Sequence, residues 1–266
     1  MEGEIIWEYV LPEEFKEYTN PGFDVELISD DSILLVLPRK GVYEINRSGN
    51  VLWSYLDPKV SHDADRLPNG NTLVVFGNED EKNDAQIKEI NQEGEIVWSW
   101  YAKDHFDTES YKDIYEQGWT HTNAVVRLDN NNTLISPRNF GFLIEVNSTG
   151  HIVRTIGEGV LDHQHDPEIL SNGNILMVNH FTNHKAIELD PNTSEIIWEY
   201  EMPEKTKPVR DANRLPNGNT LITGSTAIVE VTSDKEIVWR LKFKELQFRP
   251  EEGAARGFYK AERIYQ

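Results

Sequence analysis

The chain has 266 residues, enough for one large all-β domain or two smaller ones. Asp and Glu number 46 against 26 Lys and Arg, and a formal net charge of −20 repels nucleic acids and anionic lipids as partners. The sequence contains no Cys, which excludes disulfides, thiolate metal sites and a cysteine nucleophile.

Neither the start of the chain nor any later stretch resembles a targeting or membrane segment. The N-terminal MEGEIIWEYVLPEEF has no basic start and no long apolar run, so we expect no signal peptide in this sequence. This leaves open a cytoplasmic location or export with a removed leader. No stretch approaches about 18 apolar residues, so we expect no membrane span.

The chain then reads as a repeat of β-strands. The N-terminal GEIIWEYV predicts a strand around Trp7, and residues 23–56 predict a set of four strands. Four later stretches each combine a short alternating run, a turn rich in Asn and Gly, and a second apolar run; they begin at His62, His121, His163 and Arg210. Asn-Gly supplies the left-handed backbone of a tight turn, so each stretch predicts a β-hairpin. A second pair of strands follows each hairpin.

Four strands per unit, repeated along the chain, are typical of the blades of a β-propeller. A tryptophan recurs in the fourth strand as Trp53, Trp98, Trp198 and Trp239, whereas the third blade has Arg154 there. The C-terminal GFYKAERIY reads as an innermost strand, which the N-terminal strand would complete from outside and so remove exposed sheet edges. We therefore expect a single all-β domain over 1–266, a six-bladed propeller whose last blade joins both termini. Residues 103–119 form an insertion that we expect near one mouth of the channel.

Aligning the blades on the last apolar residue before each turn places one residue of each blade at the same mouth. The first strand lines the channel and the second runs back beside it, so residues before the first and after the second meet there. The aligned ring consists of Phe23, His62, Asn123, His165, Arg210 and Tyr259. Near the same entrance we expect Asn78, His121, Arg138, Asn139, His163, His180, Ser225 and Thr226.

Two other interpretations of these histidines compete with an anion-binding site. In a wet polar channel, histidines could merely hydrogen-bond to water and backbone. Alternatively, His62, His121 and His165 could form a three-imidazole metal site. Arg138 and Arg210 argue against a metal, because they would place positive charge beside the cation.

An oxyanion site fits the residue types better. Arginine offers a planar fork of donors, and imidazoles offer donors or a nucleophile near neutral pH. Asp63, Asp166 and Asp211 follow their ring residues directly, and strand alternation turns such neighbours away from the channel. We therefore expect an anion site with no channel-facing carboxylate, no metal and no cofactor.

At these positions the chain resembles the arylsulfate sulfotransferase family. The resemblance rests on HDADRLPNGNTL, on HTN and SPRN with His121 and Arg138, and on QHDPEILSNGNIL with His165, in that order. It covers the propeller from about Phe23 to the C-terminus. Family members are six-bladed propellers that move a sulfuryl group between phenols without a nucleotide donor. Characterised members also carry an N-terminal β-domain and a disulfide, neither of which this sequence shows.

The resemblance implies a role for each matched residue. His165 would be the nucleophile that forms a transient sulfohistidine, and His62, His121 and Arg138 would bind the sulfuryl oxygens. Asn123, Asn139, His163, His180, Arg210, Thr226 and Tyr259 would surround the substrates. The implied partners are a small aryl sulfate donor and a phenolic acceptor. The alternative is a non-catalytic propeller that binds an anionic ligand or a protein.

Overall fold

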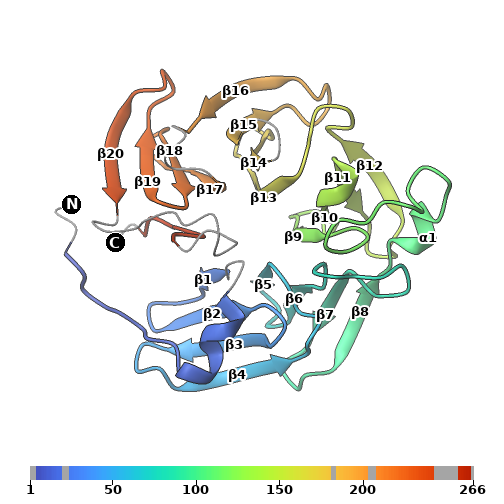
Figure 1. Cartoon of the computed structure of the whole chain (residues 1–266), viewed down its shortest axis with the longest axis horizontal. Coiled ribbons are helices and arrows are strands. Elements are labelled where there is room, and N and C mark those ends of the chain that lie inside the picture. Colours follow the sequence, from blue (N-terminus) through green and yellow to red (C-terminus); the bar gives the residue numbers. More distant parts are fainter. Residues whose placement is uncertain (1–3, 20–23, 181–183, 203–207, 243–256, 265–266) are drawn as a thin grey trace.

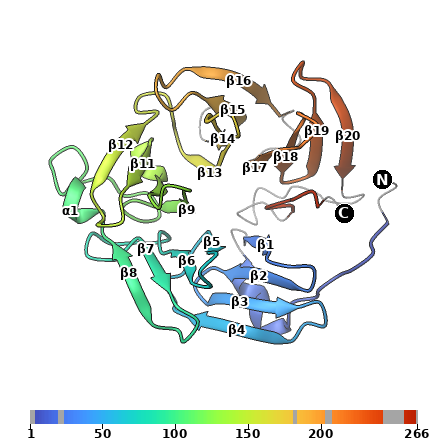
Figure 2. The ribbon, with the colours of Figure 1, turned by 180° about the vertical axis from the view of Figure 1, so that it is seen from behind.

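The computed structural model of the protein describes residues 4–19, 24–180, 184–202, 208–242 and 257–264. Its strands form five four-stranded antiparallel sheets, arranged as blades around a common centre (Figure 1). The strands of each blade are hydrogen-bonded in chain order, and the ring is seen again from behind in Figure 2. The prediction of an all-β propeller with four-stranded blades is confirmed. No helix in the described ranges is long and apolar enough to cross a membrane.

The elements are as follows. Blades 1 and 2 consist of β1 (Val25–Leu27), β2 (Ser32–Leu37), β3 (Gly41–Asn46), β4 (Val51–Leu56), β5 (Ala64–Arg66), β6 (Thr72–Val75), β7 (Ile87–Ile90) and β8 (Ile96–Trp100). Blades 3 and 4 consist of β9 (Thr122–Arg127), β10 (Thr133–Pro137), β11 (Leu143–Val146), β12 (Ile152–Ile156), β13 (Gln164–Ile169), β14 (Ile175–Asn179), β15 (Lys185–Leu189) and β16 (Ile196–Glu201). Blade 5 consists of β17 (Val209–Arg214), β18 (Thr220–Gly224), β19 (Ala227–Val231) and β20 (Ile237–Lys242). The helical elements are η1 (Glu13–Thr19), α1 (Lys103–Phe106) and η2 (Arg138–Phe140).

The Asn-Gly turns close the inner hairpins as the sequence predicts. In blade 2, Gly70 has a φ of 87°, a backbone conformation that glycine adopts without steric cost. The turn is closed by Leu67 N, which donates to Asn71 O at 2.8 Å, and by Gly70 N, which donates to Leu67 O at 2.9 Å. These turns fix where the first and second strands begin and end, and therefore which residues reach each mouth of the channel.

A glutamate in the third strand connects neighbouring blades. In blade 2, Glu89 accepts hydrogen bonds from Asn71 Nδ2 of its own hairpin and from Arg127 Nη2 of blade 3, both at 2.7 Å. The Arg127 guanidinium also lies 5.7 Å from the centre of the Trp98 ring. We call this arrangement of glutamate, arginine and tryptophan the interblade clamp. It recurs with Glu44, Arg66 and Trp53, with Glu188, Arg214 and Trp198, and with Glu230, Arg263 and Trp239.

Apolar side chains fill the space between adjacent blades. Leu34 and Val36 of β2, for example, pack in one cluster with Val74 and Phe76 of the next blade. The six residues of β2 are all buried, whereas the outermost strand β4 alternates between exposed and half-buried positions. The inner strands are thus held rigidly from both sides, which makes them a firm support for residues at the channel mouths.

The expected sixth blade is wrong, because the described residues contain five sheets rather than six. The segments at 4–12 and 257–264 have no strand, yet each docks where the alignment placed it. Trp7 Nε1 donates to Arg47 O at 2.9 Å, as Trp53 Nε1 donates to Gln92 O at 3.0 Å one blade further on. At the C-terminal end, Phe258 N donates to a blade 5 carbonyl at 3.0 Å. A strand needs a neighbouring ladder of hydrogen bonds, and no described second or third strand stands between these segments.

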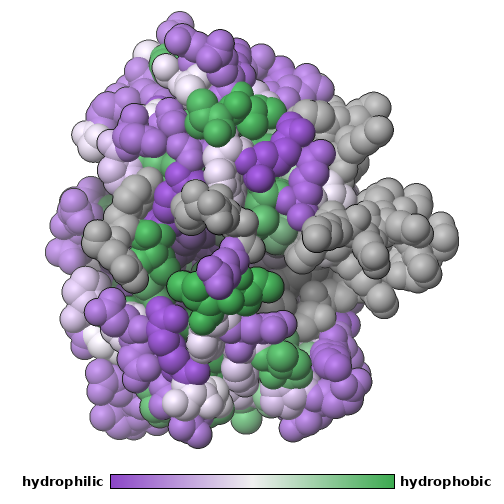
Figure 3. Space-filling model, turned by 90° about the vertical axis from the view of Figure 1, so that its left-hand side faces the viewer, coloured by the Kyte–Doolittle hydropathy of each residue, from purple (hydrophilic) through white to green (hydrophobic). Residues whose placement is uncertain are grey.

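The docked N-terminal segment leaves an apolar groove beside blade 1. Figure 3 shows this side of the molecule, where hydrophobic side chains gather around a hollow in the surface. The groove measures about 420 Å³ and lies between residues 7–11 and the blade, with Ile33, Leu35 and Ile45 in its wall. Trp7 packs against the same buried cluster, whereas Ile6 next to it is 90% exposed.

These contacts predict that Trp7 stabilises the fold from outside the sheets. Trp7→Ala should lower the free energy of unfolding by about 1–3 kcal/mol, because it removes a half-buried ring and its hydrogen bond. Ile6→Ala is the matched control in the same segment and should leave the stability almost unchanged. Urea unfolding of the three proteins measures the difference. Equal stability of the two variants would show that the segment does not hold the ring together.

Candidate functional site

Five of the six aligned ring positions converge on one small cavity. The cavity measures about 20 Å³, room for about one water molecule. His62, Asn123, His165, Arg210 and Tyr259 all line it. The sixth position, Phe23, lies outside the described residues. The blade alignment therefore brings together the side chains that it selected.

His62 and His121 form a hydrogen-bonded pair at this mouth. Gln117 O only accepts, so His121 donates to it from Nδ1 at 3.0 Å, which leaves His121 Nε2 as an acceptor when the ring is neutral. His62 then donates from Nε2 to His121 Nε2 at 3.0 Å, and Tyr259 Oη lies 3.4 Å from the remaining nitrogen, His62 Nδ1. Burial, and next the His121 charge, lower the pKa of His62 well below its usual value. Burial, and next Arg138, lower the pKa of His121 to about 4, so both rings are neutral at neutral pH.

Arg138 belongs to a second chain of contacts, which includes the insertion. Its Nη2 donates to Glu116 Oε1 at 3.1 Å, and the other oxygen of Glu116 lies 3.1 Å from His163 Nε2. His163 Nδ1 in turn lies 2.6 Å from Asp162 Oδ1. Burial raises the pKa of Glu116, but the His163 hydrogen bond and the Arg138 charge lower it below its usual value. Glu116 is therefore ionised and holds Arg138 in place.

Asn139 fixes the insertion over the mouth. Its Nδ2 donates to three backbone carbonyls of the insertion, those of Glu116, Gly118 and Trp119, at 3.1, 2.9 and 3.3 Å. An aromatic cluster that includes Phe106, Tyr111 and Phe140 supports the same segment. The insertion is thus a packed part of this mouth, and Glu116 and Gln117 are site residues that the blade alignment missed because the insertion does not belong to the repeat.

His165 of β13 and His180, the residue directly after β14, form an edge-to-face pair with ring centres 5.1 Å apart. His165 is 7% exposed, and burial, followed by the His180 and Arg210 charges, lowers its pKa well below the usual value. Both ring nitrogens of His180 are buried without a hydrogen-bond partner among the described residues. Burial, and next Arg210, lower the pKa of His180 to about 2. The pair is therefore neutral, with lone pairs available at neutral pH.

The expectation that the channel contains no carboxylate is wrong, because Asp24, Asp63 and Asp166 line the same cavity. Strand alternation fails here for two reasons. β5 begins only at Ala64, so Asp63 precedes the regular strand. In β13 the register shifts between His165 and Glu168, and Asp166 has a φ of 49°, so consecutive side chains face the cavity. Asp211 instead accepts hydrogen bonds from Asn213 Nδ2 at 2.8 and 2.9 Å.

Lys260 balances this acidic layer. Its Nζ lies 2.9 Å from Asp24 Oδ1 and 3.8 Å from Asp166 Oδ2. Burial lowers the pKa of Lys260, but the surrounding carboxylates, Asp166 foremost, raise it well above the usual value. The aligned positions directly after the ring hold Asp24, Asp63, Ala124, Asp166, Asp211 and Lys260. Lys260 is the cation in this aligned set, a signal that the sequence already contained.

Arg210 differs from the other basic groups of the mouth. Its guanidinium lies 5.7 Å from the centre of the Tyr259 ring, and it forms no ion pair with any residue that the structure describes. Burial lowers the pKa of Arg210, which means that the charged form lacks the compensation that water would give. A largely desolvated cation that has no ion-pair partner among the described residues is stabilised when an anion enters beside it. Arg210 therefore marks this cavity as a place for an oxyanion.

Thr226, which we expected at the same entrance, lies half-buried in the turn between β18 and β19 and is not among the residues that line the cavity.

Across the described parts of the chain, no group of three or more His, Asp or Glu side chains is placed to hold a metal ion. His62 and His121 direct their Nε2 atoms at each other, which uses the lone pair that a metal would need.

Solved structures share this fold at low sequence identity. A protein of unknown function from Bacteroides caccae is 20% identical, with a TM-score of 0.65 over 91% of this chain and 86% of its own. Virginiamycin B lyase from Staphylococcus aureus is 13% identical, with a TM-score of 0.57 over 84% of this chain and 70% of its own. The WD40 β-propeller domain of Doa1 is 14% identical, with a TM-score of 0.54 over 83% and 63% of the two chains. These likenesses show the propeller fold alone.

Family membership comes from the sequence. No curated protein matches the chain. The model of the arylsulfotransferase (ASST) family matches residues 1–161, more than half of the 266 residues. The matched segment contains His62, His121 and Arg138 and ends before His165. It supports a sulfotransferase-type function in general, and it shows that the chain belongs to the arylsulfotransferase family.

Proposed function

We propose that the chain transfers a sulfuryl group from an aryl sulfate to a phenol, with His165 as the nucleophile. The observation that carries this proposal is one cavity lined both by a neutral buried imidazole, His165, and by a guanidinium with no ion-pair partner in the described ranges, Arg210. Arg210 attracts a tetrahedral oxyanion, and the neutral ring beside it is the form of histidine that attacks sulfur.

In the first half-reaction, the lone pair of a His165 ring nitrogen attacks the sulfur of the aryl sulfate. An N–S bond forms, and the bond from sulfur to the aryl oxygen breaks, with its electron pair leaving on the phenolate. The second ring nitrogen of His165 gives up its proton, and the phenolate takes one up, so the products are a sulfohistidine and a neutral phenol. Tyr259 and His62 line the same cavity, with Tyr259 Oη 3.4 Å from His62 Nδ1, and would relay this proton; burial raises the pKa of Tyr259 to about 12, so its hydroxyl stays protonated and can donate.

In the second half-reaction, the acceptor phenol attacks the sulfur of the sulfohistidine. The N–S bond breaks, its electron pair returns to His165, and the phenol proton restores the neutral ring. Asn123 lines the cavity, and its buried Oδ1 has no partner among the described residues, because its Nδ2 donates to Gln164 O at 2.7 Å. That oxygen is the acceptor for the incoming phenol hydroxyl. The two steps give ping-pong kinetics without a nucleotide.

Arg138, His62 and His121 would stabilise the sulfuryl oxygens in both steps. Arg138 hydrogen-bonds to Glu116, and His62 and His121 hydrogen-bond to one another. An entering sulfate must therefore exchange these partners, whereas Arg210 donates without any exchange. These contacts support a division of roles in which Arg210 captures the anion first and the other donors stabilise the charge that develops in the transition state.

A second candidate is a propeller that binds a small oxyanion without chemistry. One observation favours it: the cavity has room for about one water molecule. A bare oxyanion needs less rearrangement of the insertion than an aryl sulfate does. Incubation with p-nitrophenyl sulfate, with and without phenol, separates the two candidates. Release of p-nitrophenol that depends on phenol is expected of a sulfotransferase, and a propeller that only binds the anion would release none.

The role of His165 predicts a variant that binds but does not react. His165→Asn should abolish phenol-dependent release of p-nitrophenol and keep the parent circular dichroism spectrum. His151→Asn, which changes an exposed histidine of blade 3, is the matched control and should retain full activity. Mass spectrometry after mixing with donor alone and an alkaline quench should find the sulfuryl adduct on the peptide that contains His165. Full activity of His165→Asn would exclude covalent catalysis by this residue, and an adduct on His163 or His180 would assign the nucleophile elsewhere.

The unpaired charge of Arg210 predicts a large kinetic effect. Arg210→Met should reduce kcat/KM by about thirty- to a thousand-fold, since loss of one charge-assisted contact costs about 2–4 kcal/mol in the transition state. Arg240→Met removes the same charge from an exposed position of β20 and should leave kcat/KM unchanged. Steady-state kinetics with p-nitrophenyl sulfate measure both. A loss below about three-fold in Arg210→Met would mean that another group captures the anion.

The lowered pKa of His165 predicts the pH dependence of the first half-reaction. A base whose pKa is depressed stays unprotonated until the pH falls through the lowered value, so its activity persists below the usual histidine pKa of about 6.5. Single-turnover release of p-nitrophenol should therefore be level from about pH 8 to about pH 5.5. Circular dichroism at each pH controls for unfolding. A decline with a midpoint near 6.5 or higher would show that the attacking ring is not shielded from solvent.

A further inference from the structure

The junction between blades 3 and 4 lacks the aromatic part of the interblade clamp. Arg154 stands where the fourth strand of the other described blades has a tryptophan, and Ile169 stands where the next blade supplies an arginine. Glu145 still has an ion pair, because Arg154 Nη2 lies 2.8 Å from Glu145 Oε2, but both residues belong to blade 3. Glu145 also accepts from Asn132 Nδ2 at 2.6 Å, as the clamp glutamates of blades 2, 4 and 5 accept from an asparagine of their own hairpins. The two exchanges therefore keep the charge of the glutamate paired within its own blade and remove the indole from the junction.

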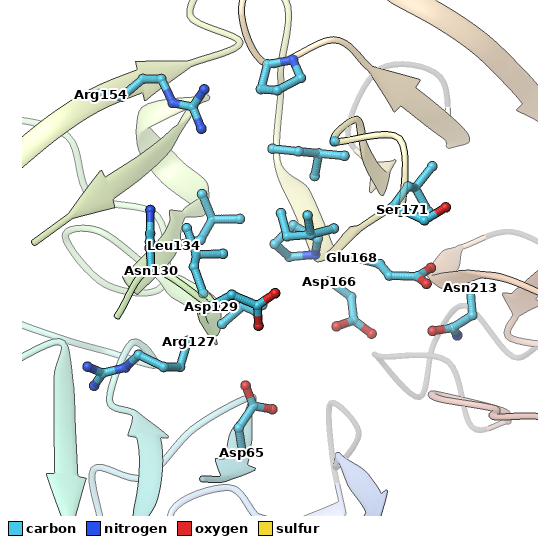
Figure 4. Close-up of a pocket in the computed structure, with 18 residues that line it drawn as sticks. Asp65, Arg127, Asp129, Asn130, Leu134, Arg154, Asp166, Glu168, Ser171 and Asn213 are labelled. Carbon is cyan, nitrogen blue, oxygen red and sulfur yellow. The ribbon is translucent and has the colours of Figure 1, made fainter. Parts of the chain in front are cut away.

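The missing indole leaves a hollow. A pocket of about 770 Å³ extends from the channel mouth to Arg154, with Leu134, Ile169, Ile175 and Pro191 in its wall (Figure 4). The equivalent hollow between blades 2 and 3 is smaller, about 550 Å³. It is lined by Arg127 and Glu89 of the clamp, and Trp98 is not in its wall. Within one molecule, the larger of the two hollows is the one at the junction that has no indole.

The inner end of this pocket is acidic. The carboxylates of Asp65, Asp129 and Asp166 point toward a common space in Figure 4. The strands that carry them begin at the histidine mouth, and Asp129 follows the end of β9, so the pocket opens at the opposite mouth of the channel. An apolar slot with a guanidinium at one end and carboxylates at the other favours a ligand with two parts: a flat aromatic ring next to the guanidinium and a positively charged group next to the carboxylates.

We propose that this pocket binds a small aromatic amine, with its ring in the place of the missing indole. The ring would lie between the Arg154 guanidinium and the Ile169 side chain, as Trp53 lies under Arg66 with 4.8 Å between the guanidinium and the ring centre. The ammonium group would face the carboxylates at the channel mouth. The site shares Asp166 with the histidine cavity but extends from it toward Arg154, and it does not depend on sulfuryl transfer.

The experiment restores the clamp. The double variant Arg154→Trp with Ile169→Arg gives this junction the residues of the other described junctions, so its new indole should occupy the proposed ring site and raise the melting temperature. Binding of 5-fluorotryptamine is measured by ¹⁹F NMR on the parent, on the double variant and on Asp129→Asn. We expect saturable binding to the parent, at least about ten-fold weaker binding to the double variant, and a several-fold loss in Asp129→Asn.

The controls separate the ring from its charge. 5-Fluorotryptophol, which has the same ring and a hydroxyl in place of the amine, should bind the parent more weakly than 5-fluorotryptamine and should not respond to Asp129→Asn. Arg240→Met changes an exposed arginine of β20 and should bind like the parent. No saturable binding to the parent would overturn the proposal, and so would equal binding to the parent and to a folded double variant.

Discussion

A glutamate in the third strand of blades 2, 4 and 5 receives hydrogen bonds both from its own inner hairpin and from an arginine of the following segment, and the arrangement of the ring depends on it. Glu188, for example, accepts from Asn174 of its own hairpin at 2.7 Å and from Arg214 of the next blade at 2.8 Å. Burial raises the pKa of Glu188, but the Asn174 and Asn172 donors and the Arg214 charge lower it below the usual value, so the glutamate stays ionised. One ionised group thus fixes the inner turn relative to the neighbouring blade. Because the first strands are positioned in this way, their ends meet at defined points of the channel.

The propeller was predictable because its signals are local. An Asn-Gly turn, its second asparagine and the alternating strands around it determine a hairpin without reference to the rest of the chain, as Gly70 and Asn71 illustrate. The sixth blade was not predictable in the same way. Trp7 and Arg263 carry the sequence pattern of a blade and make the contacts of one. A strand also requires neighbours on its edges, and pattern alone does not supply them.

The site shows the same division between repeat and exception. Alignment of the blades predicted that His62, His165 and Arg210 would meet, because equivalent positions of a propeller converge on its axis. It failed at Asp166, where a bulge with a left-handed residue replaces the alternation that the argument assumed. It also missed Glu116, because the insertion belongs to no repeat and its approach to Arg138 depends on tertiary packing. The bulge at Asp166 and the insertion with Glu116 are thus the parts of the mouth that the repeat pattern of the sequence could not predict.

Tyr259 and Lys260 come from the segment that docks beside blade 5 at the end of the described chain, yet both line the central cavity. Their place in the cavity therefore exists only while that segment is docked. By thermodynamic linkage, any anion that gains affinity from Tyr259 or Lys260 must stabilise the docked segment by the same free energy. Ligand binding in the cavity and docking of the 257–264 segment are consequently coupled equilibria. A bound ligand would therefore hold this C-terminal segment against the rest of the ring.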